Sequence, residues 1–289
     1  DSETIYTCYV TDSRRKLEGI VTVRELLLSP KNAVLRDIME TNVKFVSTHT
    51  DQEEAARLLS KYDFLALPVV DAEERLVGIV TVDDAMDVLT EAAAEDLSIM
   101  AAVTPDEKPY FAASAWEHAR HRVVWLLILM LSAAITGSII TRYEDAISAV
   151  PLLVAFLPML MDTGGNCGSQ SATLVIRGLA LEEIRPRDAL RVIRKELAVA
   201  AIISAVLAAA NGLRIYLQYH DSAIALVISL SLAATVVLAK LVGCMLPIAA
   251  KQLHMDPAIM ASPLITTIVD AGAVLIYFQA AAALLRLPV

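Results

Sequence analysis

Several features that mark common protein classes are scarce in this 289-residue chain. Its three cysteines, Cys8, Cys167 and Cys244, form no CxxC pair, so we expect free thiols and no disulfide framework. No cluster of His or Met side chains favours copper or zinc, and neither an HExxH nor a GxSxG motif occurs. The first residues do not resemble a signal peptide. The sequence therefore gives no sign of a disulfide-rich secreted protein or of a common hydrolase.

Basic charge is also scarce, and acidic residues dominate the N-terminal third of the chain. The whole sequence holds 33 Asp+Glu against 24 Lys+Arg, which gives a net charge of −9. Residues 1–110 hold 22 of these acids and 11 of these basic residues, so the remainder is nearly neutral. We expect an acidic soluble domain followed by a membrane domain. An acidic surface disfavours nucleic acid as a partner and favours cations.

Apolar residues are abundant, at 56% of the sequence. Five stretches are long enough to cross a bilayer, at about Val123–Ile140, Ala146–Ile176, Leu197–Leu213, Ala223–Ala250 and Ala258–Leu285. Basic residues from Arg177 to Lys195 gather between the second and third stretches, and such loops face the cytoplasm. This pattern predicts an integral protein of a bacterial-type plasma membrane, with its N-terminal domain in the cytoplasm and its C-terminus outside.

An eight-residue pattern occurs twice in the acidic part. KLEGIVTV at residues 16–23 returns as RLVGIVTV at residues 75–82, offset by 59 residues. Each copy is typical of a turn, an apolar strand and a helix, and a helix at Asp51–Lys61 and a strand at Ala66–Asp71 precede the second copy. The pattern resembles a tandem CBS domain pair whose first copy is truncated. The resemblance implies an α/β module that senses a ligand and does not catalyse a reaction.

A helix is expected at Asp83–Met100, between the two parts of the chain. Its acids Asp83, Asp87, Glu91 and Glu95 follow one another at i,i+4 spacing. Like charges at this spacing repel by about 0.2–0.5 kcal/mol per pair, and bound divalent cations would remove that repulsion. The alternative interpretation is a solvated acidic face. Because the helix connects a sensor to a membrane domain, our hypothesis is that it collects divalent cations when they are abundant.

The second apolar stretch contains a run of small and polar residues, Met161–Thr173. Such residues at membrane depth do not face lipid, which predicts that Asp162, Asn166 and neighbouring groups line a pore. The alternative is that Gly164 and Gly168 form a small-xxx-small packing face, which explains the glycines alone.

The last apolar stretch has one carboxylate, Asp270, near its middle, with Thr266 and Thr267 about one turn earlier. A charge at mid-membrane costs about 2.5–3.5 kcal/mol and marks a functional candidate, here the wall of a cation path. The alternative is a structural ion pair with Lys240. Oxygen ligands suit hard cations such as Mg²⁺, Ca²⁺ or Mn²⁺. One carboxylate per chain does not balance a dication, so we expect a two-fold dimer with Asp270 near its axis.

Taken together, the CBS-like repeat, the acidic helix, PMLMDTGGNCGSQSATLVIRG and DPAIMASPLITTIVDAGAVLIYF resemble the MgtE-type magnesium transporter or channel family over the whole chain. The resemblance implies a homodimer that passes Mg²⁺ and closes when cytoplasmic Mg²⁺ binds regulatory acids. The pore residues that it implies are Asp270, Gly165, Asn166, Ser169 and Thr173. The regulatory acids that it implies are Glu53, Asp84, Asp87, Glu95 and Asp256.

The expected fold is multi-domain: a CBS-type α/β domain at residues 1–82, an acidic connecting helix and linker at 83–110, and five transmembrane helices at 111–289. In the family a further acidic domain precedes the CBS pair, so we expect an N-terminally truncated member.

An alternative role is open for Asp256. It is followed by Pro257, and this pair is also typical of a plain helix cap.

Other functions remain open at this point. A broader transporter could admit Mn²⁺ or Co²⁺. An intramembrane enzyme would need Asp162 and Asp270 as a catalytic pair. A chloride channel is disfavoured, because acids in a pore repel anions.

Overall fold

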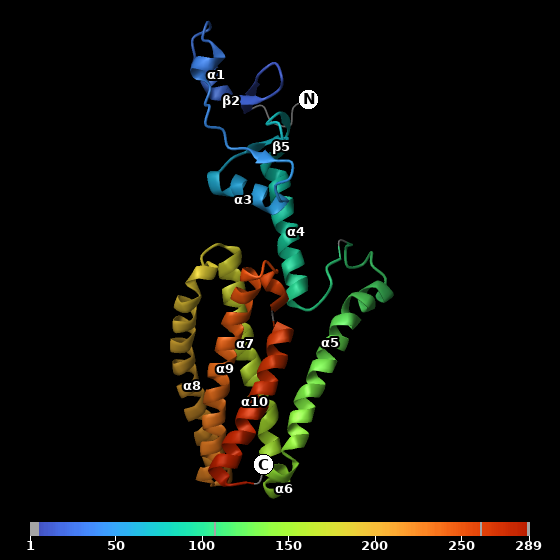
Figure 1. The fold of residues 1–289 in the computed structure, drawn as a ribbon, viewed down its shortest axis with the longest axis vertical. Coiled ribbons are helices and arrows are strands. Elements are labelled where there is room, and N and C mark those ends of the chain that lie inside the picture. The colour runs from blue at the N-terminus through green and yellow to red at the C-terminus, as the bar shows by residue number, and fades with distance from the viewer. Residues whose placement is uncertain (1–5, 107, 261, 288–289) are drawn as a thin grey trace. The chain divides into compact units, whose positions relative to one another are not determined.

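The computed structural model describes residues 6–106, 108–260 and 262–287, in which the chain divides into two compact units, Asp1–Ala94 and Glu95–Val289. Figure 1 shows strands and short helices in the first unit and long helices in the second. Each unit is described by itself.

The first unit contains two small sheets. Its elements are β1 (Thr7–Thr11), β2 (Leu17–Thr22), α1 (Val23–Leu28), α2 (Leu35–Ile38), β3 (Val46–Ser47), α3 (Gln52–Tyr62), β4 (Ala66–Val70), β5 (Leu76–Thr81) and the start of α4 (Val82–Met100). Strands β1 and β2 pair antiparallel, while β4 pairs parallel with β3 and antiparallel with β5. The buried face of α3, with Ala55, Ala56 and Leu59, packs against Val46 and Leu67. The predicted helix and strand before the second copy are confirmed.

The two copies of the repeat have matching hairpins. In each hairpin the register shifts near its end, between Val10 and Thr11 in the first and between Val69 and Val70 in the second. Since both the pairing and the irregularity recur 59 residues apart, the sequence repeat is also a structural repeat.

Equivalent aspartates hold the turns of the two hairpins. The Oδ1 atoms of Asp12 and Asp71 each accept hydrogen bonds from the backbone N–H groups two and four residues later, at 2.8–3.0 Å. Arg15 and Glu74 then adopt positive φ angles of 66° and 61°. The hydrogen bond from the Arg75 backbone lowers the pKa of Asp71, so that this carboxylate stays ionised.

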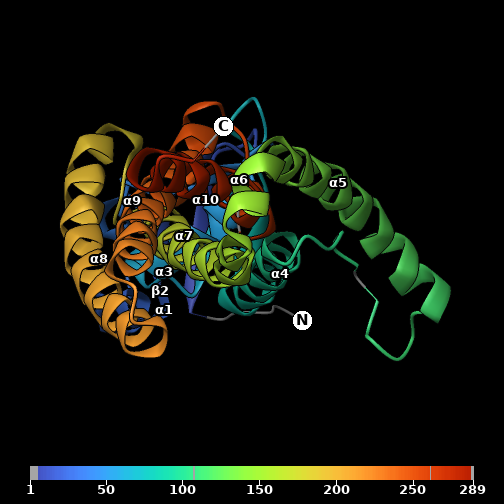
Figure 2. The ribbon, with the colours of Figure 1, turned by 90° about the horizontal axis from the view of Figure 1, so that it is seen from below.

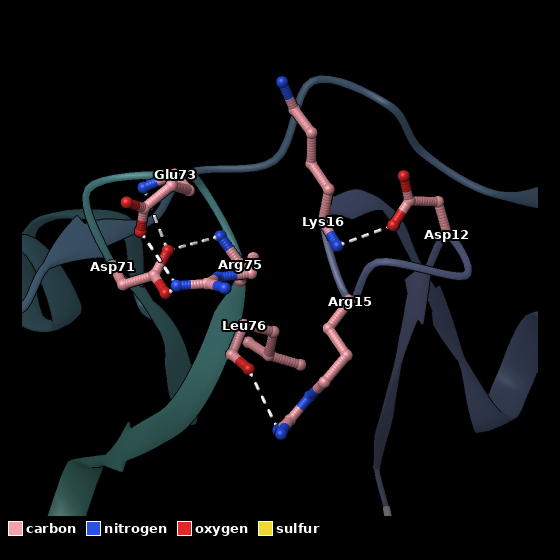
Figure 3. Close-up of polar contacts among 7 residues, drawn as sticks. All are labelled: Asp12, Arg15, Lys16, Asp71, Glu73, Arg75 and Leu76. Carbon is pink, nitrogen blue, oxygen red and sulfur yellow. Dashed lines mark hydrogen bonds and ion pairs between the residues drawn. The ribbon is translucent and has the colours of Figure 1, made fainter.

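The two turns also contact each other, as Figure 3 shows for Arg15 and Leu76. The backbone N–H of Leu17 donates to Glu74 O at 3.2 Å, and that of Leu76 donates to Arg15 O at 2.8 Å. An ion pair of 2.5 Å joins Lys16 to Glu74. The repeats therefore meet through their turns in a reciprocal, pseudo-two-fold arrangement.

The second unit is helical. Its elements are the end of α4, α5 (Ala115–Arg142), α6 (Glu144–Ala149), α7 (Leu157–Ala180), α8 (Ala189–Tyr219), α9 (Ser222–Gln252) and α10 (Ser262–Leu285), with 3-10 turns at Pro151–Phe156, Pro186–Asp188 and Pro257–Met260. In the described residues, four helices are long and apolar enough to cross a membrane; they correspond to α5, α8, α9 and α10. The second predicted span, Ala146–Ile176, corresponds in part to α7, whose polar residues lower its apolar character.

Helix α7 packs against both α9 and α10, while α8 lies on the other side of α9 (Figure 2). Helix α5 contacts α10 but is otherwise little covered within the chain, with only Thr136 buried among its described residues. The aromatic side chains of Tyr277 and Phe278 on α10 form the centre of the largest core cluster, and the Tyr277 hydroxyl donates to Leu153 O at 3.0 Å.

One predicted boundary was wrong. The stretch Ala146–Ile176 is not one helix: α6 ends at Ala149, a 3-10 turn begins at Pro151, and α7 begins at Leu157 with Pro158 in its first turn. Proline lacks an N–H and restrains the residue before it. The third predicted stretch, Leu197–Leu213, lies inside a longer helix, since α8 begins at Ala189. Charged side chains are compatible with a helix that extends beyond the membrane core, so hydropathy alone did not find its start.

Candidate functional site

A polar stripe runs along one face of α7. Asp162, Asn166, Ser169 and Thr173 are spaced four, three and four residues apart, so they lie on one side of the helix. The side chains of Asp162, Asn166 and Thr173 are exposed in the single chain, and Ser169 is partly buried. We call these four residues the α7 stripe. Asp162 and Asn166 were predicted as pore residues from the polar run, and Asn166, Ser169 and Thr173 from the family resemblance; the structure places all four on this face.

The glycines of α7 lie on its packed face. Gly164 and Gly168 are buried against side chains of α9 and α10, which confirms the packing interpretation of the small residues. Gly165, predicted as a pore residue, is also buried and lies against Thr266 of α10. The structure therefore places Gly165 at a helix contact and outside the α7 stripe.

Asp270 lies on α10, where it is partly buried. Its carboxylate is close enough to that of Asp162 for the two charges to interact electrostatically. The hydroxyls of Thr266 and Thr267 both donate to Pro263 O, at 2.9 and 3.0 Å, so their oxygens remain able to accept hydrogen bonds. Two packed helices thus offer oxygens of both kinds: a carboxylate from Asp162 on α7, and a carboxylate and hydroxyls from Asp270, Thr266 and Thr267 on α10.

The alternative partner proposed for Asp270 is engaged elsewhere. Lys240 of α9 pairs with Glu196 of α8, with Nζ and Oε2 3.9 Å apart. Among the described residues no Lys, Arg or His forms an ion pair with Asp270. The hypothesis of a structural Asp270–Lys240 pair is therefore wrong, and the negative charge of Asp270 is left for another partner.

Sequence reasoning missed Glu196. It precedes the predicted third span and looked like part of a solvated basic loop, but in α8 it is only 8% exposed. One signal could have found it. Val192, Glu196, Ala200 and Ser204 recur every four residues and form the buried face of α8.

Three of the predicted regulatory acids lie in the first unit. Glu53 of α3 pairs with Arg57 at 2.6 Å. Asp84 of α4 caps its helix, since one of its oxygens accepts from the Thr81 hydroxyl at 2.5 Å and from the Thr81 N–H at 3.3 Å. Asp87 is exposed one turn later. Each carboxylate therefore keeps at least one oxygen on the surface side of the unit.

The capping role of Asp84 also follows from the repeat. Its counterpart in the first copy is Glu25, which accepts hydrogen bonds from the N–H and the hydroxyl of Thr22 at 2.7 and 2.9 Å. These bonds lower the pKa of Glu25. An acid at this position is thus explained by helix capping in both copies, whatever else it does.

The other two regulatory acids lie in the second unit. Glu95 is exposed near the end of α4. Asp256 accepts a hydrogen bond from the Ala258 backbone at 2.8 Å, which confirms its interpretation as the cap of the 3-10 turn before α10. Among the described residues, no three His, Cys, Asp or Glu side chains gather closely enough to hold a metal ion.

Two family models match the chain. One, named MgtE and described as a divalent cation transporter, matches residues 157–280, which include α7, α8, α9 and most of α10. The other, the CBS domain, matches residues 35–91.

Curated relatives cover nearly the whole chain. The magnesium transporter MgtE of Thermus thermophilus is 42% identical over 286 residues, which are 99% of this chain and 63% of that protein. The magnesium transporter MgtE of Bacillus subtilis is 38% identical over 289 residues, with the same coverage of 99% and 63%. The chain thus spans less than two thirds of the length of these relatives.

A crystal structure of the soluble part of a magnesium transporter is 42% identical and covers 32% of this chain and 36% of that chain, with a TM-score of 0.32. The named relatives are transporters and not enzymes, so the aspartate pair of α7 and α10 does not indicate catalysis. The chain is therefore similar to the MgtE family of divalent cation transporters: residues 157–280 match that family model, and the curated magnesium transporters align with 99% of the chain.

Proposed function

We propose that this chain carries Mg²⁺ across a membrane along a path lined by the α7 stripe and Asp270. The observation that carries the proposal is the state of Asp270: it is partly buried on a membrane helix, lies near Asp162 and has no cationic partner among the described residues. Two carboxylates in a site of low dielectric repel each other, and a dication relieves that repulsion.

The chemistry of the path suits Mg²⁺. Asn166, Ser169 and Thr173 offer amide and hydroxyl oxygens, which contact a hard cation or its bound waters. Mg²⁺ keeps several of its waters when it binds protein, so few direct ligands are needed. Oxygen ligands also accept Mn²⁺, and flux measurements with each ion distinguish a magnesium transporter from a broader one.

The membrane domain of the proposal has five spans, α5 and α7 to α10. Helix α7 is included as a membrane span despite its polarity, because α9 and α10 bury one of its faces and the α7 stripe on the other face lines a path away from lipid. With Arg185, Arg187, Arg191 and Arg194 on the cytoplasmic side, the CBS region also lies in the cytoplasm.

Two chains complete the path. The α7 stripe is exposed in the single chain, and polar side chains at membrane depth face water or protein. A two-fold axis beside the α7 stripe and Asp270 would cover this face with its own copy and bring two Asp270 side chains to one ion.

Intracellular Mg²⁺ closes the path in this proposal. In this proposal the acids Glu53, Asp84, Asp87, Glu95 and Asp256 bind it, and like charges along helix α4 repel one another when it is absent. Helix α4 carries three of them and connects the CBS region to the membrane region.

Mg²⁺ flux into proteoliposomes tests the path. We expect Asp270→Asn to lower the flux about tenfold or more, because a charged contact to the ion is worth about 1.5–3 kcal/mol. Asp221→Asn is the matched control: Asp221 caps α9 through its side chain, and Asn caps a helix equally well. Full flux in Asp270→Asn would contradict the proposed path. The same vesicles with Mn²⁺ and Co²⁺ measure selectivity.

Gating is tested in the same vesicles with Mg²⁺ on the CBS side. We expect Asp84→Asn/Asp87→Asn/Glu95→Gln to keep conducting at internal Mg²⁺ that closes the wild type. The amide oxygen that replaces the Asp84 carboxylate preserves the helix cap, so only charge is removed. Glu18→Gln/Asp37→Asn, which neutralises two exposed acids outside α4, should close normally. Normal closure of the triple variant would exclude these acids as the sensor.

A further inference from the structure

Side chains from three helices meet at one buried carboxylate oxygen. The hydroxyl of Ser171 on α7 donates to Glu196 Oε2 on α8 at 2.5 Å, and Lys240 Nζ on α9 lies 3.9 Å from the same oxygen. Ser171 is 0% exposed, Glu196 8% and Lys240 3%. We call these residues the α7–α8–α9 anchor.

Stability alone does not explain the anchor. Removing two charges from water is costly, and well-packed apolar residues usually replace a buried ion pair without loss of stability. The separation of 3.9 Å between Lys240 and Glu196 exceeds an ordinary hydrogen bond, so the pair gains less than one of ideal geometry. The arrangement does orient the helices. An apolar contact lets two helices slide against each other, whereas a buried hydrogen bond to a charged oxygen fixes the rotation of α7 about its axis and its position along that axis.

The anchor holds the back of the helix that carries the α7 stripe. At about 100° per residue, Ser171 lies about 140–180° around α7 from Asp162, Asn166, Ser169 and Thr173. The surrounding face of α7 contains Gly164 and Gly168, which let the neighbouring helices approach closely, and Val175 and Leu179, which make apolar contacts with the cluster around Ile248. The Ser171–Glu196 hydrogen bond joins a side chain of α7 directly to a side chain of α8.

We propose that Glu196 and Lys240 are positioning residues that act through Ser171 to hold the α7 stripe toward the ion path. The Lys240 ammonium balances the charge of Glu196, and Glu196 accepts the bond from Ser171. The inference rests on the proposed transport function, but it concerns residues that contact no ion. Under this proposal, the ion selectivity of the path depends on the α7–α8–α9 anchor, as does the assembly of the helices.

Two double variants separate positioning from stability. Glu196→Gln/Lys240→Met removes both charges but leaves an amide oxygen that accepts from Ser171. Glu196→Leu/Lys240→Met removes both charges and the acceptor. We expect both proteins to assemble with the elution volume of the wild type, because neither leaves an unpaired buried charge. The Gln variant should keep the wild-type Mg²⁺ flux and Mg²⁺:Mn²⁺ flux ratio. The Leu variant should lose flux by about threefold to thirtyfold and change the ratio, as coupling through a packed contact does.

A serine pair gives an independent comparison. Ser171→Ala cuts the bond to Glu196 and leaves the ion pair in place. Ser204→Ala is its control, since Ser204 is also buried but donates to Ala201 O in its own helix. We expect Ser171→Ala to behave like the Leu variant and Ser204→Ala like the wild type.

Wild-type flux and selectivity in both Ser171→Ala and Glu196→Leu/Lys240→Met would overturn the inference and reduce the anchor to helix packing. Loss of flux in the Gln variant as well as the Leu variant would also overturn it, because the charges and not the bond would then matter. Failure of the proposed function is distinguishable, since wild-type vesicles would then carry no Mg²⁺ at all.

Discussion

Single residues decide how closely the helices of the second unit approach. At the crossing of α7 and α9, a Cβ atom added to Gly243 would overlap the carbonyl oxygen of Gly168, which belongs to the backbone and does not move easily. The absence of a side chain at Gly243 therefore fixes the distance between the helix that carries the α7 stripe and the helix behind it.

We expect Gly243→Ala to lower the thermal unfolding midpoint in detergent, because overpacking of a close contact costs about 1–3 kcal/mol. Gly137→Ala on α5 is the control. Nothing lies within 4 Å of a Cβ at Gly137, so that change should leave the midpoint unchanged or raise it slightly. An unchanged midpoint for Gly243→Ala would show that the helices separate without cost.

At the scale of residues, an acid on a helix can cap that helix or bind a cation, and sequence alone does not separate these two roles. Asp84 and Asp256 both cap helical turns through their side chains. The pattern of Asp256 before Pro257 predicted its cap, because capping is local. The cap by Asp84 was not predicted, although Thr22 and Glu25 stand at the same positions of the first repeat.

At the scale of elements, α7 differs most from what hydropathy predicts. Its hydrophobic side chains are concentrated on the face that packs on α9 and α10, and its other face carries the α7 stripe. A search for long apolar helices in the described residues finds α5, α8, α9 and α10 and passes over it. A helix that lines a path within a membrane is expected to be the least apolar of its bundle.

Cysteine labelling tests which face of α7 meets water. In a Cys8→Ser background, we expect Asn166→Cys to react with a charged thiol reagent and to be protected by Mg²⁺. Leu174→Cys should react slowly, because Leu174 is 58% exposed in the single chain but lies outside the α7 stripe and would face lipid or protein. The native Cys167 and Cys244 are buried and serve as a silent background. Faster labelling at Leu174→Cys would reverse the assignment of the two faces.

At the scale of the whole molecule, the surfaces left open by one chain indicate what is needed to complete it. The α7 stripe is exposed, and much of α5 is exposed and apolar, so lipid or another copy must cover them in a membrane. The relatives matched by the chain are longer, and the proposals for transport and gating concern the part that it spans.

Cross-linking tests the two-chain path. In the Cys8→Ser background, we expect a short bifunctional thiol reagent to join two Thr173→Cys chains, because the axis lies beside the α7 stripe. Ile202→Cys is the control, since Ile202 is 68% exposed on α8, on the other side of α9. A dimer band with Ile202→Cys and none with Thr173→Cys would move the axis to another face.

The sequence by itself determined the features that depend on local pattern. Hydrophobic length indicated the membrane helices, the recurrence of GIVTV indicated a strand and a helix in each of two repeated units, and the solitary Asp270 marked the candidate site. These follow from composition and spacing along a single segment, where the physics of helix, strand and bilayer acts directly.

Only the tertiary structure decided which partners these segments find. It paired Lys240 with Glu196 and left Asp270 without a cationic partner among the described residues, and it joined Ser171 to an oxygen 25 residues away in sequence. It also put Gly165 against α10 and the rest of the predicted α7 residues on the open face. Such contacts depend on the rotation and crossing of whole helices, which side chains from several segments fix together, so no single stretch of sequence contains them.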